Sequence, residues 1–263
     1  MNMDAFIRAL LEAAKGAGIE AAEVYLSSGD SFRAMCVQGE ISNYTVNTSR
    51  GLSLRGLYQG KMGYAATEAF DEDAVEQMVQ AVKESAELTE DEDIQEIYQG
   101  DPEYPEVNEY RPELDEVPEE KKLAFLLEAE RLAKAADPRI EQLSYNMITT
   151  GSNEIRIANS FGLDLRHRDN MAAAFISATA REGDRVSTGS AFEAGRDFGK
   201  MNAEKLAREA TEEALFMLKA APVLSGTYRA LIDAKCMPDL LGVFCGIFSA
   251  ESAQKGMSLL AGK

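Results

Sequence analysis

A series of three patterns occurs twice along the 263-residue chain and limits the folds open to it: a helical stripe, short strand-like runs, and a second helical stripe. In residues 1–88, apolar residues recur at helical spacing from Phe6 to Ala13. A second stripe follows Asp71, a residue type that caps helices. This order predicts a first unit of two helices and antiparallel strands.

The strands expected in this first unit lie on either side of two turns. Gly39 supplies the positive φ that a hairpin turn at residues 38–40 requires. A second hairpin is expected around residues 56–61. The strand-like runs are 22–26, 32–37, 41–46, 52–55 and 62–65.

The second unit, residues 119–221, repeats the order. A helix is expected over 119–136 and ends at Asp137-Pro138, because the residue before a proline disfavours helical backbone. A last helix is expected over 202–218. Between them, Gly-bearing turns, including one at Gly151, separate runs typical of an antiparallel meander. These runs are 140–149, 153–159, 163–169, 172–181 and 184–191.

The two units are joined by residues 89–118, which hold four prolines and many acidic residues. This composition favours a solvated linker or a surface crossing. Residues 222–263 predict a buried strand at 226–233 and an apolar helix at 239–249. We therefore expect an α+β fold of two helix-plus-antiparallel-sheet units, followed by the start of a third, β-rich C-terminal domain that is truncated.

Charge and cysteine content exclude several classes of protein. Asp and Glu number 45 against 27 Lys and Arg, and the net charge of −18 disfavours direct binding of nucleic acid. The acidic surface favours solubility or docking of a basic partner. No apolar run reaches the roughly 20 residues of a membrane span. Cys36, Cys236 and Cys245 form no CxxC motif, which predicts a reducing, cytoplasmic location.

The sequence offers few side chains for chemistry. A catalytic metal site needs about three protein ligands, and His167 is the only histidine. It lies between Arg166 and Arg168, a context typical of a surface strand. Cys245 has only apolar neighbours, which favours core packing over a nucleophilic thiol. We therefore expect no catalytic residue and no metal in this chain.

Residues 240–263 read LLGVFCGIFSAESAQKGMSLLAGK. They join an apolar helical pattern to a run of small and polar residues, which a buried helix alone does not require. This stretch resembles the TldD/PmbA family in its PmbA (TldE) branch, where a close variant begins the C-terminal domain. Residues 21–25, 51–55 and 158–162 agree with the resemblance. The family is associated with cytoplasmic proteolysis, peptide maturation and modulation of DNA gyrase.

In the TldD branch, a helix with His-Glu-x-x-x-His resembles that of a zinc protease. Aligned with it, Gly242 and Ile247 fall at the histidine positions and Val243 at the glutamate. These residues can neither bind zinc nor activate water. The resemblance therefore implies a subunit without the zinc motif, paired with a zinc-bearing TldD-type subunit or self-associating. Candidate residues for peptide or partner contact are Ser249, Glu251, Ser252 and Lys255.

The expected substrates are peptides or unfolded proteins, and addition of a peptide strand to an open sheet edge is one route of capture. Two alternatives remain. The protein could be an active metallopeptidase whose ligands lie in a missing C-terminal region. It could instead be a non-enzymatic acidic protein that modulates DNA gyrase.

Overall fold

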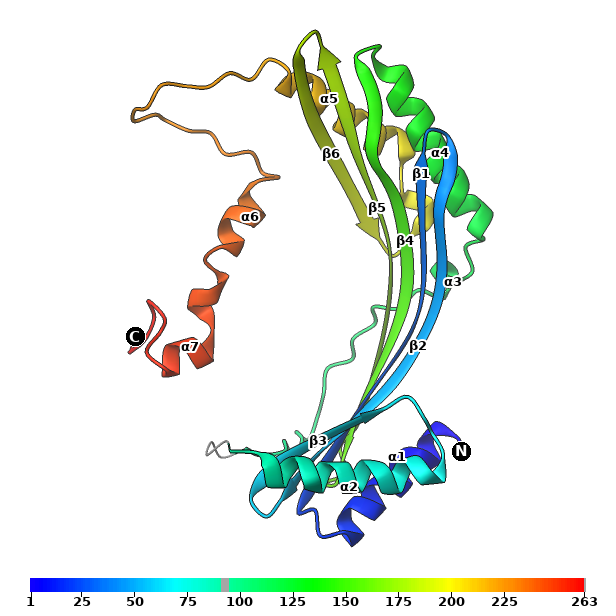
Figure 1. Ribbon diagram of the computed structural model, residues 1–263, viewed down its shortest axis with the longest axis vertical. Helices are drawn as coiled ribbons and strands as arrows, with labels where there is room; N and C mark the ends of the chain where they lie inside the picture. The colour runs from blue at the N-terminus through cyan, green and yellow to red at the C-terminus, as the bar shows by residue number, and fades with distance from the viewer. Residues whose placement is uncertain (91–94, 263) are drawn as a thin grey trace. The chain divides into compact units, whose positions relative to one another are not determined.

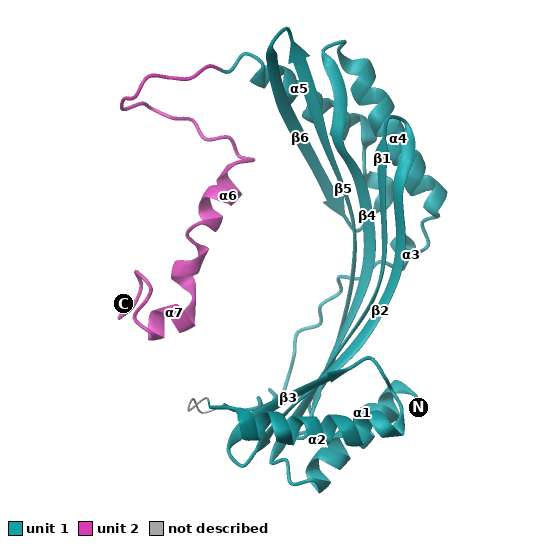
Figure 2. Cartoon of the chain, viewed as in Figure 1, with its two compact units in different colours: residues 1–220 teal, residues 221–263 magenta. Residues whose placement is uncertain are grey.

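A computed structural model describes residues 1–90 and 95–262 of the chain. The chain divides into two compact units, Met1–Ala220 and Ala221–Lys263 (Figure 2). No helix among the described residues is long and apolar enough to cross a membrane.

One antiparallel sheet of six strands forms the framework of the first unit (Figure 1). The strand order is β3-β2-β1-β4-β5-β6, so the central pair joins the early and late halves of the unit. The strands are β1 (Ala21–Val37), β2 (Glu40–Tyr58), β3 (Lys61–Thr67), β4 (Ile140–Asn159), β5 (Asp164–Glu182) and β6 (Arg185–Gly195).

Two pairs of helices cover different parts of this sheet, and each pair encloses its own core. Helices α1 and α2 pack on β1, β2 and β3 around Phe6, Leu10 and Val82. Helices α4 and α5 pack on β4, β5 and β6 around Leu126 and Ile176. The helices are α1 (Met3–Gly16), α2 (Glu72–Leu88), α4 (Glu119–Ala136) and α5 (Ala203–Met217), with the short α3 (Pro112–Asp115) and η1 (Phe198–Lys200).

The predicted α+β class is confirmed, and several local predictions hold. Asp71 caps α2, because its carboxylate accepts a hydrogen bond from the Ala74 N–H (2.9 Å). The β1–β2 turn has positive φ at Gln38 and Gly39, as a two-residue hairpin requires. Helix α4 has the predicted bounds. The domain boundaries drawn from the sequence remain predictions.

The strands are longer than the sequence pattern suggested. Gly151 was expected to separate two strands, but this is wrong, since it lies inside β4 opposite Ser31 of β1. A Cβ on Gly29 would lie 2.7 Å from the Ser152 carbonyl oxygen. Glycine here allows close approach of two strands and does not form a turn.

Residues 95–118 cross the surface with more anchoring than a solvated linker would have. Ile97 and Leu114 are buried. The side chain of Asn170, fully buried in β5, accepts a hydrogen bond from the Arg111 N–H (2.9 Å) and donates to the Arg111 carbonyl (2.7 Å). The side-chain amide of Asn170 thus forms with Arg111 the same two hydrogen bonds that the backbone of a neighbouring strand would form.

In the second unit, two predictions are wrong. Residues 226–233 form no strand and are exposed. The helix expected over 239–249 is broken into α6 (Met237–Gly242) and η2 (Cys245–Phe248), and α7 (Ala250–Gln254) follows. None of these helices has a buried residue, and short helices depend on packing for their stability.

Candidate functional site

The three positions that match the family metal helix lie in the second unit and do not share one helix. Gly242 ends α6, Val243 caps it, and Ile247 lies in η2. None of the three side chains carries a metal-binding atom. Since α6 is broken before η2 begins, even substituted ligands would lack the common helical face on which such a motif depends.

Among the described residues, no group of three or more His, Cys, Asp or Glu side chains could hold a metal ion. His167 lies on β5, and its Nε2 is 3.5 Å from a Glu109 carboxylate oxygen and 3.7 Å from one of Asp169. These contacts fit the predicted surface strand position. Cys245 is exposed, so its predicted core packing is wrong, because η2 has no buried residue.

The candidate contact residues form the start of α7. The Ser249 hydroxyl accepts a hydrogen bond from the Ser252 N–H (3.2 Å) and so caps the helix. Glu251 pairs with Lys255 one turn later (2.7 Å), which lowers the pKa of the Glu251 carboxyl. This segment therefore presents an ordered polar turn, and its role in peptide or partner contact remains a prediction.

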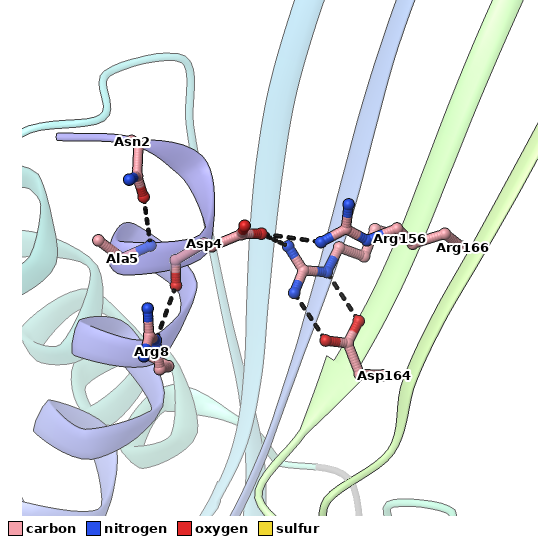
Figure 3. Close-up of polar contacts among 7 residues, drawn as sticks. All are labelled: Asn2, Asp4, Ala5, Arg8, Arg156, Asp164 and Arg166. Carbon is pink, nitrogen blue, oxygen red and sulfur yellow. Dashed lines mark hydrogen bonds and ion pairs between the residues drawn. The ribbon is translucent and has the colours of Figure 1, made fainter.

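A cluster of four charged side chains connects α1 to the sheet (Figure 3). Arg156 of β4, with only 8% of its side chain exposed, binds Asp164 of β5 through two hydrogen bonds of 2.7 and 2.6 Å. It also pairs with Asp4 of α1, which accepts a further bond from Arg166 (2.8 Å). Hydrogen bonds from Arg156 lower the pKa of both Asp4 and Asp164. Asp164 and Asp4 together occupy both edges of the Arg156 guanidinium group. We therefore interpret this cluster as a structural link between α1 and the sheet.

A second buried charge fixes the tip of the β1–β2 hairpin. Glu130 of α4 accepts hydrogen bonds from the Cys36 thiol (2.8 Å) and the Gly39 N–H (3.0 Å), and it pairs with Lys134 (2.5 Å). Burial would raise the pKa of Glu130, but these hydrogen bonds together lower it. Burial and the nearby carboxylate raise the pKa of Cys36 to about 12, so this thiol is a poor nucleophile.

Lys122 is a third buried charge that sequence reasoning missed. It lines a hollow of about 220 Å³, donates to Thr150 Oγ1 (3.0 Å) and lies over the Phe32 ring at 4.8 Å. Burial lowers its pKa. A signal was present, since Lys122, Leu126, Ala129, Glu130 and Ala133 share the buried stripe of α4. A charged residue on the apolar face of a helix predicts a buried charge, and this pattern identifies both Lys122 and Glu130.

Two family models match the chain. Residues 22–86 match the PmbA/TldA metallopeptidase domain 1, and residues 112–218 match the PmbA/TldA metallopeptidase central domain. Together they account for more than half of the sequence. Among curated proteins, a metalloprotease of Methanocaldococcus jannaschii is 21% identical over 230 residues, which are 85% of this chain and 49% of the relative.

Solved structures share the fold. A protein of Thermotoga maritima, proposed to modulate a DNA gyrase, has a TM-score of 0.90 and 24% identity, over 100% of this chain and 59% of that one. TldE of Thermococcus kodakarensis has a TM-score of 0.82 and 19% identity, over 98% and 58% of the two chains. The sequence thus spans about half the length of the curated relative and three-fifths of these structures.

Proposed function

The chain belongs to the PmbA/TldA metallopeptidase family, and from that premise we propose that it is a PmbA/TldE-type subunit that does not itself carry the catalytic zinc. One observation carries this proposal. At the positions matching the metal helix, Gly242 and Ile247 replace the histidines and Val243 replaces the glutamate. The ligands and the general base are therefore missing together.

In this proposal, a TldD-type partner binds the zinc ion, and the two subunits together process peptides. The family membership supports a role in proteolysis. The ordered polar turn from Ser249 to Lys255 is a candidate for contact with the partner or the peptide. A cytoplasmic location belongs to the same proposal.

Metal content tests the first part. The purified protein should hold no stoichiometric zinc when its metal content is measured by elemental analysis after mild chelation. A value of about one tightly held zinc ion per chain would show that ligands exist outside the matched positions and would overturn the proposal.

Activity tests the second part. Mixing the protein with a tagged TldD-type partner should give copurification and peptidase activity that is lost when the metal histidines of the partner are replaced. If activity survives that replacement, the catalytic residues lie in this protein. The rival reading of an active metallopeptidase would then be correct.

Restoring the motif provides a control. The triple variant Gly242→His, Val243→Glu, Ile247→His supplies two ligands and a base, but a zinc site needs a third ligand and supporting hydrogen bonds. The matched positions also lie on two short helices, α6 and η2. We expect the variant to show no peptidase activity alone, and activity would contradict this view of the site.

A further inference from the structure

A hollow of about 220 Å³ lies where the start of α4 meets strands β1, β2 and β4. Phe32 of β1 belongs to the same core as Leu126 of α4, so its side chain lies on the face of the sheet that α4 covers. Thr150 and Val46 are the strand partners of Phe32 on either side, and paired residues share a face. These three side chains line the hollow together with Lys122 of α4.

The ammonium group of Lys122 has unused donors in this hollow. Only 6% of the residue is exposed, and its Nζ donates to Thr150 Oγ1 (3.0 Å) and lies 4.8 Å from the centre of the Phe32 ring. Within the described part of the chain, no carboxylate pairs with it, and the charges of Glu119 and Asp115 act on it only through space. An ammonium group has three N–H donors, so two remain for another partner.

The opposite charge gathers at the open end of the same hollow. Asp30, Asp115 and Glu119 line it, and all three are exposed residues. Asp30 accepts a hydrogen bond from Thr48 (2.6 Å), and Glu119 accepts one from the Tyr44 hydroxyl. Each carboxylate has about four lone-pair sites, so acceptors remain unused. The hollow therefore has a cation at its buried end and anions at its exposed end.

This order of charges fits a ligand that carries both charges. A simple anion would pair with Lys122 but would be repelled by the three carboxylates, and a simple cation would be repelled by Lys122. An α-amino acid has a carboxylate and an ammonium group on the same carbon atom. Its carboxylate could accept hydrogen bonds from Lys122 and from the Thr150 hydroxyl while its ammonium group donates to Glu119.

We propose that this hollow binds a free α-amino acid with an apolar side chain, its carboxylate on Lys122 and its ammonium group toward the acidic rim. The Phe32 ring and Val46, which is 58% exposed, offer apolar surface to the ligand side chain. A bound carboxylate would give Lys122 the ion-pair partner that the free protein does not supply. This inference does not depend on the proposed function.

Ligand analogues test the charges. Leucine should bind the full chain with a dissociation constant below about 10 mM in calorimetric titration. N-acetylleucine lacks the ammonium group and leucinamide lacks the carboxylate, so each should bind at least about tenfold more weakly. Absence of leucine binding at about 10 mM, or equal binding of either analogue, would overturn the proposal.

A variant at Lys122 tests the location. Lys122→Met keeps the length of the side chain and should weaken leucine binding at least about tenfold. Its melting temperature without ligand should not fall, because a buried charge without an ion-pair partner is replaced by an apolar group. Lys121→Met, an exposed neighbour on α4, is the matched control and should bind leucine normally. Unchanged affinity in Lys122→Met overturns the site, and a large fall in its melting temperature would assign the ammonium group to the fold instead.

A variant at the rim tests the orientation and leaves Lys122 intact. Glu119→Gln should raise the dissociation constant for leucine about threefold or more and reduce the preference for leucine over N-acetylleucine. Glu120→Gln makes the same change at the next residue, which does not line the hollow, and should alter neither value. If the preference is the same in Glu119→Gln as in the native protein, the ammonium group of the ligand does not face this carboxylate and the proposed orientation is wrong.

Discussion

Glu130 shows how a single buried residue can contribute to the tertiary structure. It joins α4 to the turn between β1 and β2 through Cys36 and Gly39. Its pKa is lowered in the folded protein, so its charge contributes stability above the pKa of the unfolded chain, about 4.3. That contribution is lost as the pH falls through the folded pKa.

Replacing this charge should therefore have a pH-dependent effect. We expect Glu130→Gln to lower the free energy of unfolding by about 1–3 kcal/mol at pH 7, because a buried charge-assisted network is broken. The difference from the native protein should shrink below about pH 4. Glu128→Gln, on the exposed side of α4, is the control and should have little effect. Urea titrations across pH measure both, and a difference that does not change with pH would contradict the assignment.

The three thiols should differ in reactivity. Cys36 is buried and its pKa is raised to about 12, whereas Cys236 and Cys245 are exposed. Titration of the native protein with a thiol reagent at pH 8 should therefore show two fast groups and one that reacts only after unfolding. Fast modification of all three would contradict the burial of Cys36.

At the level of elements, two glycines on edge strands let helices lie against the sheet. A Cβ on Gly63 of β3 would be 1.9 Å from the Val82 carbonyl oxygen of α2. A Cβ on Gly189 of β6 would be 2.2 Å from the Ala214 nitrogen of α5. Both contacts involve helix backbone, which cannot move aside as a flexible side chain would.

Adding a methyl group at these positions should separate helix from strand. We expect Gly63→Ala and Gly189→Ala each to destabilise the protein by at least about 1–3 kcal/mol, as overpacking does. Gly195→Ala on β6 is the matched control, because its Cβ would meet nothing within 4 Å. Thermal unfolding of the three variants measures this, and equal melting temperatures would contradict the close approach.

At the level of the first unit, Arg156 connects the amino-terminal helix to the centre of the sheet. It binds Asp4 of α1 and Asp164 of β5 while lying on β4 (Figure 3). Segments more than 150 residues apart in sequence are thereby held together. Since β1 also pairs with β4, the early and late halves of this unit depend on each other.

Loss of this link should loosen α1 more than the rest of the unit. We expect Arg156→Met to cost about 1–3 kcal/mol, because several hydrogen bonds to charged groups are lost. Amide hydrogen exchange should rise most in residues 3–16. Arg166→Gln removes one exposed contact and should change exchange much less. Uniform exchange across the unit in Arg156→Met would show that the cluster does not anchor α1.

Local features were predictable from the sequence because they depend on neighbours along the chain. The cap at Asp71, the hairpin turn at Gly39 and the helix over 119–136 follow from side-chain and backbone preferences acting within a few residues. The interpretation of Gly242 and Ile247 as degenerate ligand positions came from the family resemblance, and it remains a prediction. The α+β class was predictable from the order of the helical and strand-like patterns along the chain.

Other features depended on contacts that no local pattern encodes. The glycine at position 151 looked like a turn, and only its approach to β1 shows that it continues a strand. No local pattern identified the partners of Arg156 or Glu130, because Arg156 pairs with Asp4, 152 residues away, and Glu130 with Cys36, 94 residues away. The helix expected at 239–249 is interrupted between Gly242 and Cys245, and neither α6 nor η2 has a buried residue. Burial and strand pairing arise between distant segments, and therefore tertiary structure alone decides them.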